Sequence, residues 1–215
     1  MKKAKILYGC FLLTSTFIIL SCTSGVKDID GNIYKAVKIG TQTWMTGNLN
    51  VSRFRNGDSI PQVKSAEEWI KSGKEGKSAW CYIENNSENG GKYGKLYNWY
   101  AVTDPRGLAP KGWHVASDQE WAKVIYSLGG GISAALSIRT TGLSGAEQSG
   151  FSALPGGCRN GNGVFYGVDS FGCWWSATED NSATGWMYVL NYIKCDINSL
   201  YTHKTYGVSV RCILD

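Results

Sequence analysis

The chain has 215 residues, which is enough for one domain with a sizeable core. Only 18% of the residues are charged, whereas 27 are Gly, 9 are Trp and 12 are Tyr, a composition that favours a loop-rich fold with large buried aromatics over a helical bundle. The formal net charge of +5 falls to +2 without the three lysines of the first 21 residues, which is too small to indicate nucleic acid or an anionic surface as a partner.

The first 21 residues have the layout of a secretory signal peptide. Three lysines precede an apolar stretch at 6–20, which is too short to span a bilayer comfortably, and a small residue, Ser21, follows it. The phrase ILSC at 19–22 resembles a bacterial lipobox, in which the cysteine is acylated before cleavage. We therefore expect residues 1–21 to be removed and Cys22 to carry a lipid that holds the protein on a membrane. The alternative is an ordinary signal peptide with an incidental cysteine.

The residue after the cysteine indicates which membrane the lipoprotein is sorted to. Thr23 stands where Asp would favour the inner membrane under the enterobacterial sorting rule, so we expect an outer-membrane lipoprotein that faces either the periplasm or the medium. Residues 22–27 are expected to form a lipidated tether, and a single domain is expected at 28–215.

The first half of the domain predicts a β-hairpin and two short helices. Two β-runs at 34–39 and 42–45 are separated by a Gly-Thr turn. The helices are expected to start after Ser65 and after Ser117, because each serine is followed three residues later by Glu, as in a capping box. A third candidate helix lies at 96–102.

The helix after Ser117 has an apolar face that is expected to enter the core. Its apolar residues are spaced at i, i+3, i+4 and i+7 and are Trp121, Val124, Ile125 and Leu128. Glycines at 129–131 are expected to end this helix and the helical part of the chain.

The remainder predicts short strands between turns rich in Gly, Asn, Asp and Ser. The expected strands lie at 151–154, 164–166, 173–177, 186–192 and 206–213. Because helices come early and antiparallel strands late, the expected fold class is α+β.

Five cysteines follow the tether, and none has the CxxC spacing of a zinc or redox site, so disulfides are expected in an oxidising compartment. Cys158 and Cys173 flank a glycine-rich turn, and Cys195 and Cys212 flank a polar loop, so each pair is a candidate. Cys81 competes for Cys212, and the odd number leaves at least one cysteine free.

Six phrases along the chain resemble one family. They are TWMTGNLN at 43–50, YGKLYNWYAV at 93–102, GLAPKGWHVASDQEW at 107–121, SGFSALPGG at 149–157, GCWWSATED at 172–180 and GVSVRC at 207–212. Over roughly residues 28–215 the chain is similar to the Fibrobacter succinogenes major paralogous domain, a family of secreted or lipid-anchored proteins. That family usually has Tyr where Cys158 and Cys173 stand, which implies that the two cysteines were gained together as a disulfide.

Two of these phrases also carry a more distant resemblance. HVASDQEW at 114–121 and GVSVRC at 207–212 are similar to phrases of the formylglycine-generating, sulfatase-modifying family. This resemblance implies a C-type-lectin-like fold, with two main short helices, a small antiparallel sheet joining the termini and a long glycine-rich loop region. Fold analogy does not license a reaction.

Catalytic machinery is not evident. Of the two histidines, His114 is expected to be a hydrogen-bonded structural residue and His203 a solvated loop residue, rather than general bases. No GxSxG phrase occurs, and only Cys195 lies near the place of the paired reactive cysteines on which formylglycine-generating enzymes depend. We therefore expect no enzyme activity and no catalytic residue.

Metal ligands are not evident either. The phrases with which C-type lectins bind Ca²⁺ do not occur in the sequence. Glu179, Asp180 and Asn181 offer oxygen ligands, but a solvent-facing acidic turn is the preferred interpretation. Calcium is thus a conceivable but unsupported cofactor, and no metal site is expected.

Aromatic and polar residues of the glycine-rich segments are the candidates for ligand contact, because indole and phenol rings stack on sugars and peptides. We expect Trp175 and Trp186 in the core. The candidate contacts are Arg159, Asn162, Tyr166, Trp174 and Tyr201.

The expected function is non-enzymatic binding of an extracellular polysaccharide or surface protein by a domain anchored to the membrane through Cys22. Since the terminal strands are expected to pair, the loop face is expected to point away from the membrane. One alternative is a structural or adhesive component of a surface or fimbrial assembly. A degenerate enzyme of the formylglycine-generating type is the second alternative.

Overall fold

The computed structural model describes residues 25–139 and 149–215. The expected signal peptide, the expected acylation site at Cys22 and the first half of the tether, residues 22–24, lie outside these residues. Within the described ranges, no helix is both long enough and apolar enough to span a bilayer.

Five short helices and thirteen strands make up the described fold. The helices are α1 (Ala66–Lys74), α2 (Gly90–Tyr93), α3 (Trp99–Val102), α4 (Asp118–Ser127) and α5 (Gly131–Ile138), with 3-10 turns at Ile83–Asn85 and Ser87–Asn89. The strands are β1 (Val26–Lys27), β2 (Ile33–Tyr34), β3 (Ala36–Ile39), β4 (Gln42–Met45), β5 (Trp80–Cys81), β6 (Leu96–Tyr97), β7 (Trp113–Val115), β8 (Gly156–Arg159), β9 (Phe165–Val168), β10 (Phe171–Glu179), β11 (Thr184–Asn191), β12 (Asp196–His203) and β13 (Cys212–Leu214). The fold is therefore mixed α+β, as expected.

A four-stranded sheet in the order β3-β4-β13-β7 joins the two ends of the chain. The expected hairpin forms between β3 and β4, with Gly40 in the left-handed conformation at its turn. Ile213 of β13 lies opposite Trp44 on one side and His114 on the other. The expectation that the terminal strands pair in one sheet is confirmed.

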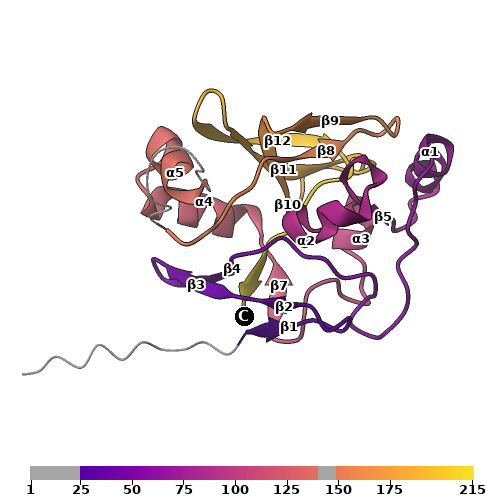
Figure 1. Ribbon diagram of the computed structural model, residues 1–215, viewed down its shortest axis with the longest axis horizontal. Coiled ribbons are helices and arrows are strands. Elements are labelled where there is room, and N and C mark those ends of the chain that lie inside the picture. The colour runs from indigo at the N-terminus through magenta and orange to yellow at the C-terminus, as the bar shows by residue number, and fades with distance from the viewer. Residues whose placement is uncertain (1–24, 140–148) are drawn as a thin grey trace, which may run out of the picture.

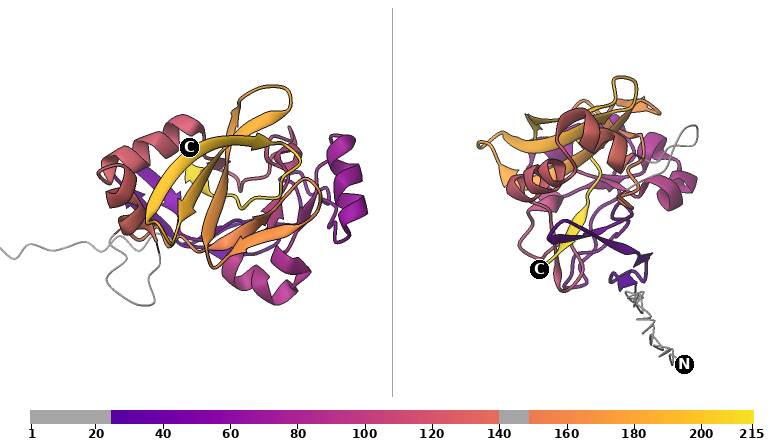
Figure 2. Two further views of the ribbon diagram at one scale, coloured as in Figure 1. Left: turned by 90° about the horizontal axis from the view of Figure 1, so that it is seen from above. Right: turned by 90° about the vertical axis from the view of Figure 1, so that its left-hand side faces the viewer.

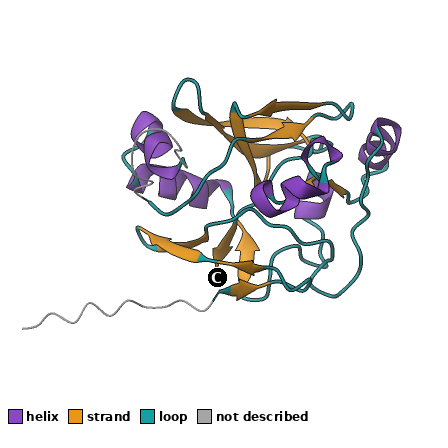
Figure 3. Ribbon diagram, in the orientation of Figure 1, coloured by secondary structure: helices purple, strands orange, loops and turns teal. Residues whose placement is uncertain are grey.

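A second sheet has five strands in the order β12-β11-β10-β8-β9 and lies at the far end of the molecule from β1, β2 and the C-terminus (Figure 1). Its neighbouring strands run antiparallel except β8 and β10, which are parallel and share a single register pair, Gly157 with Gly172. Figure 3 shows the two sheets one above the other, with α4 and α5 at one side. Regular strands thus occupy most of the expected long loop region.

The two expected helix starts are confirmed. The Ser65 side chain accepts a hydrogen bond from the Glu68 backbone at α1, and Ser117 and Glu120 form a complete capping box at α4. Trp121 and Val124 of α4 are buried, so its apolar face enters the core as expected.

Helix α5 was not expected, because the glycines at 129–131 looked like the end of the helical part. Gly129 and Gly130 both have positive φ and turn the chain sharply between α4 and α5. Ala134, Ala135 and Ile138 then bury one face of α5 against the core. In Figure 2, seen from above, α4 and α5 lie at one side of the molecule and α1 at the other.

The late strands were predicted only in part. Strands at β9, β10 and β11 are confirmed, whereas residues 151–154 contribute only an isolated bridge at Ala153 and 206–213 forms a strand only at its end. Strands β8 and β12 were missed. Strand β12 lies at the edge of its sheet, and four consecutive residues of it are exposed. Its sequence therefore lacks the alternation of apolar and polar residues that marks a half-buried strand.

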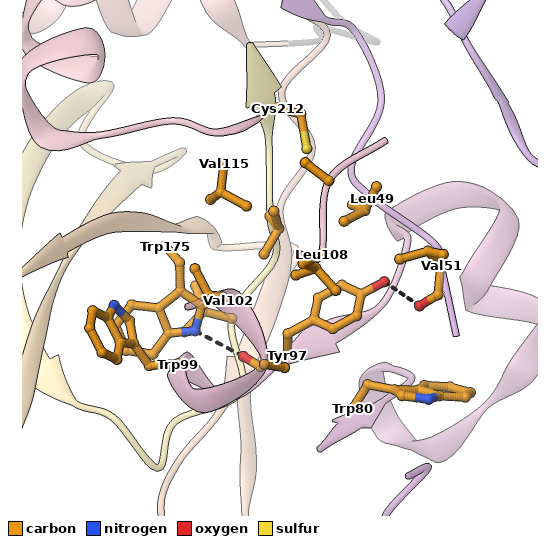
Figure 4. Close-up of a cluster of buried hydrophobic side chains, with 14 of the residues drawn as sticks. Leu49, Val51, Trp80, Tyr97, Trp99, Val102, Leu108, Val115, Trp175 and Cys212 are labelled. Carbon is orange, nitrogen blue, oxygen red and sulfur yellow. Dashed lines mark hydrogen bonds between the residues drawn. The ribbon is translucent and has the colours of Figure 1, made fainter. Parts of the chain in front are cut away.

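A cluster of aromatic rings fills the space between α4 and the sheets. Trp121 stacks on Tyr188 of β11 with ring centroids 5.0 Å apart and lies 4.9 Å from Trp44. Phe151 and Trp174 complete the cluster. A second cluster surrounds Tyr97, whose backbone oxygen accepts from Trp175 Nε1 at 2.8 Å and whose hydroxyl donates to the Val51 carbonyl at 2.7 Å (Figure 4).

A buried guanidinium ties the C-terminal strand to this core. Arg211 is 1% exposed, and its Nη1 donates to the carbonyls of Met45 at 2.9 Å and Phe151 at 2.6 Å. Its Nε donates to Asn48 at 3.1 Å, and the guanidinium lies 4.4 Å from the centroid of the Phe151 ring. One side chain thus satisfies polar groups of two segments, at 45–48 and at 151–152.

We predict that Arg211→Met lowers the free energy of unfolding by about 3–5 kcal/mol, because it leaves several buried acceptors without a donor. Urea denaturation followed by tryptophan fluorescence measures the change. Arg53→Met is the matched control, since Arg53 is exposed and its 3.6 Å ion pair with Asp30 is worth about 0–1 kcal/mol. Equal losses in the two variants would contradict this role for Arg211.

Candidate functional site

The free edge of the five-stranded sheet carries an exposed aromatic pair. Trp186 of β11 lies directly opposite Tyr201 of β12, and the two rings meet edge to face with centroids 6.0 Å apart and an interplanar angle of 89°. Tyr201 is 63% exposed, and Trp186 is partly exposed rather than a core residue as expected. We call Trp186 together with residues 198–203 of β12 the aromatic edge.

The helices leave this end of the sheet uncovered. Tyr188 lies two residues after Trp186 on the same face of β11. Its hydroxyl donates to Asp118, at the start of α4, at 2.7 Å. Beyond Tyr188, Leu190 and its partner Ile197 are buried in the cluster that α4 and α5 cover. The aromatic pair lies next to Tyr188 but outside the part of the sheet that α4 and α5 cover, so its rings stay accessible.

Polar groups surround the aromatic pair. Thr184 and His203 form the next cross-strand pair on the same face, and both are at least partly exposed. The turn that leads into β11 is fixed by hydrogen bonds from the Thr184 hydroxyl to Asp180 at 2.6 Å and from the Thr184 backbone to Asn181 at 3.1 Å. An aromatic platform beside hydroxyl, amide, carboxylate and imidazole groups is suited to stacking and hydrogen bonding with a sugar.

The backbone of β12 is the second feature of this surface. Strand β12 is an edge strand of eight residues, and Asn198, Ser199, Leu200 and Tyr201 are exposed in succession. It has no proline and no lysine within its bounds, which are common devices that protect an exposed edge from pairing with another chain.

Two of the expected contact residues are buried and are corrected here. Arg159 is 1% exposed, and its guanidinium donates to the carbonyls of Val63 at 2.7 Å, Lys64 at 2.8 Å and Ser65 at 3.0 Å. Trp174 is fully buried, and its Nε1 donates to Asn48 at 2.8 Å. Each side chain joins separate segments of the core, so neither is available to a ligand.

The remaining candidates do not form one site. Tyr166 is 41% exposed on β9, and Asn162 is exposed in the turn before it. Tyr201 lies on β12, at the opposite edge of the sheet, with β8, β10 and β11 in between. Tyr166 pairs with Cys158 across β9 and β8, so the two side chains point to the same face of the sheet. The register pairs of β8, β10, β11 and β12 place Tyr201 on the opposite face. Trp186, which the sequence analysis expected in the core, is instead partly exposed beside Tyr201.

The acidic turn after Trp175 does not gather oxygen ligands. Glu179 pairs with the buried ammonium of Lys204, and Asp180 accepts from Thr184 and Asn181. Within residues 25–139 and 149–215, no group of three or more His, Cys, Asp or Glu side chains is arranged to hold a metal ion.

The structure separates the cysteines of one expected disulfide and brings those of the other together. All five described cysteines are free thiols in this structure. Cys212 is buried between β4 and β7, whereas Cys195 lies in the β11–β12 turn, where it accepts from Arg139 at 2.9 Å, so the expected Cys195–Cys212 pairing is wrong. Cys81 belongs to a different buried cluster from Cys212. Cys158 and Cys173, by contrast, stand side by side.

His114 is held between two carboxylates. Its Nδ1 lies 2.7 Å from Asp215 and its Nε2 lies 2.8 Å from Glu120, so both nitrogens donate in the charged imidazolium form. Ser117 donates to Glu120 at 2.7 Å instead of to the imidazole. Hollows of about 400 and 450 Å³ flank the network. The structure therefore shows the hydrogen-bonded histidine that was expected.

The network is sensitive to pH. Burial acts to lower the pKa of His114, but hydrogen bonds to Asp215 and Glu120 outweigh it and raise the pKa above 6.5. Burial acts to raise the pKa of Glu120, but hydrogen bonds from Ser117 and His114 outweigh it and lower the pKa below 4.5. The His114 contribution to stability is complete below its unfolded pKa and is lost as pH rises through the folded pKa.

We predict that raising the pH from about 5.5 to about 8.5 lowers the Tm of the unmodified protein more than it lowers the Tm of His114→Gln. The expected difference is about 1–2 °C, which is small because the histidine is 40% exposed. Differential scanning fluorimetry across this pH range measures the difference. His203→Gln is the matched control and should follow the unmodified protein. A pH profile of His114→Gln that coincides with that of the unmodified protein would show that the network does not contribute.

Comparison with known proteins places the chain in a family. The sequence model described as the Fibrobacter succinogenes major domain matches residues 37–214, which is most of the chain. No curated protein matches the chain, and no solved structure matches it. The chain therefore belongs to the Fibrobacter succinogenes major domain family.

Proposed function

We propose that this protein is a lipid-anchored, extracytoplasmic binding domain of the outer membrane that captures an extracellular polysaccharide on its aromatic edge and carries out no catalysis. The pair of partly exposed Trp186 and exposed Tyr201, bordered by the polar groups of Thr184 and His203, is the observation that carries this proposal. Aromatic side chains combine a flat apolar face with a polar edge, which matches the alternating faces and hydroxyl groups of a sugar ring.

The place of the anchor supports the proposal. Strand β1 starts at Val26, four residues after Cys22, and four residues of chain span at most about 14 Å. A lipid on Cys22 would hold β1, β2 and the C-terminus close to the membrane. The aromatic edge belongs to the sheet at the other end of the molecule (Figure 1), so it would face outward.

The arrangement of the elements also supports a C-type-lectin-like fold as a proposal. The terminal strands share one sheet, a second sheet stands beyond it, and the capped helices α1 and α4 lie at opposite sides of the molecule (Figure 2). Helix α5 and the five strands of the second sheet are additions to what that resemblance implies.

A second candidate function is that of a structural or adhesive component of a surface or fimbrial assembly. The free edge of β12 favours it, because a strand of another protein can add to an exposed edge through backbone hydrogen bonds. A degenerate formylglycine-generating-type enzyme ranks below both, since Cys195 has no second cysteine beside it among the described residues.

We predict that the exported protein, released from membranes in detergent, binds a subset of saccharides on a glycan array. Trp186→Ala and Tyr201→Ala should each weaken binding at least about tenfold, because truncating a central aromatic contact costs about 1.4 kcal/mol or more. Tyr126→Ala is the matched control, since Tyr126 is 86% exposed on α4 and lies outside the aromatic edge.

Two other outcomes separate the candidates. Saccharide binding that Tyr126→Ala weakens as strongly as Tyr201→Ala would remove the aromatic edge as the site. No saccharide binding, together with photo-crosslinking of a residue at position 199 to an envelope protein on cells, would favour strand addition and the structural role.

A further inference from the structure

Two cysteines meet at the weakest junction of the five-stranded sheet. Strands β8 and β10 are parallel and share one register pair, Gly157 with Gly172. Cys158 and Cys173 each follow the paired glycine by one residue, so they lie at the same level on neighbouring strands and on the same face. Both residues belong to one buried cluster, and each thiol shifts the pKa of the other.

Both residues of this register pair lie in positions that only glycine fits. Gly157 has a φ of +65°, and a Cβ at this position would lie 2.6 Å from the Tyr166 carbonyl oxygen. A Cβ at Gly172 would lie 2.3 Å from the Trp174 ring. The backbone around the two cysteines is therefore packed too closely to accept side chains at the residues that precede them.

Tyr166 covers the pair on its outer side. It is the register partner of Cys158 on β9, so the two side chains are neighbours on the same face of the sheet. Cys158 is fully buried and Cys173 is 3% exposed, whereas Tyr166 is 41% exposed. The exposed ring of Tyr166 is thus the side chain that separates Cys158 from solvent along this row of strands.

We propose that Cys158 and Cys173 are an oxidisable dithiol that forms a disulfide across β8 and β10, with Cys158 as the attacking thiol and Tyr166 as the group that activates it. The proposal rests on the proposed export, because an oxidising compartment is where such a bond persists. The bond would fix the β8–β9 hairpin to the sheet at the place where a single register pair holds it.

The two thiols are not equivalent. Hydrogen bonds from Cys173 and from Tyr166 lower the pKa of the Cys158 thiol in spite of its burial. The hydrogen bond to Cys158 and burial raise the pKa of Cys173 well above its ordinary value. Since the thiolate is the nucleophile, Cys158 reacts first.

The reaction is a thiol–disulfide exchange with an external disulfide, of a small molecule or of an oxidoreductase. Cys158 gives its proton to solvent, and its thiolate attacks one sulfur of that disulfide, whose other sulfur leaves with the electron pair. Cys173 then loses its proton and attacks the Cys158 sulfur, which expels the second external thiolate. Two cysteines are oxidised, and one external disulfide is reduced to two thiols.

The other cysteines serve as internal controls. Burial raises the pKa of Cys81 to about 11 and that of Cys212 to about 12, and neither lies beside a second cysteine in the described structure. Cys195 is partly exposed in a turn and contacts Arg139. These three are expected to stay reduced in the folded protein.

The first test is a thiol map of the protein exported by a bacterial host. Free thiols are blocked with an alkylating reagent under denaturing, acidic conditions, and the digested protein is examined by mass spectrometry. We expect one linked peptide pair that contains Cys158 and Cys173, with Cys81, Cys195 and Cys212 alkylated. Full alkylation of Cys158 and Cys173, or their linkage to other cysteines, would overturn the proposal.

The second test is independent of export. The purified protein is reduced and then exposed to oxidised glutathione, and the Tm is measured with and without reductant. Reduction should lower the Tm by about 6–12 °C, the shift expected when a loop of 15 residues is opened in a protein of this size. Cys158→Ser and Cys173→Ser should be insensitive to reductant, and Cys81→Ser should respond like the unmodified protein.

The role of Tyr166 has its own readout. Tyr166→Phe should slow oxidation by glutathione about threefold for each unit by which the pKa of Cys158 rises, while the final disulfide and the Tm stay unchanged. Failure of the reduced protein to reoxidise at this pair would overturn the dithiol, whether or not Cys22 is acylated. An unacylated Cys22 in the exported protein would instead contradict the proposed anchor and leave this second test intact.

Discussion

The closure of the C-terminal strand between β4 and β7 is the constraint on which the rest of the structure depends. Ile213 pairs with residues on both sides, and Arg211, two positions earlier, donates to a carbonyl of β4 that lies 166 residues away in the sequence. The same guanidinium holds the segment at Phe151, which stands between α5 and the second sheet. One short strand and one buried cation therefore join the four-stranded sheet to the segment that leads into the second sheet.

This closure separates the molecule into two ends with different roles in our account. The start of the described chain and the C-terminus lie together at one end, and the five-stranded sheet lies at the other (Figures 1 and 2). Helices α4 and α5 then cover part of that sheet and stop at Tyr188, which leaves Trp186 and Tyr201 accessible. The binding surface that we propose is what the helices do not cover, rather than a separate loop.

The sequence predicted those features that depend on neighbouring residues. Ser65 and Ser117 mark helix starts because the cap and the backbone donor that it satisfies lie three residues apart. The roles of Arg159 and Trp174 could not be read in this way, because their partners at 63–65 and at Asn48 are far away in the sequence. Strand β12 was missed for a related reason: its register with β11 defines it, while its exposed polar residues resemble a loop.

Backbone amide exchange tests the central claim, that ligand binds the free edge of the second sheet, most directly. The intact lipidated protein would be compared by hydrogen–deuterium exchange with and without a saccharide selected on the array. The account predicts slower exchange in peptides that cover 184–188 and 196–203, with no change in those that cover 160–168. Protection at 160–168 with none at 196–203 would contradict it.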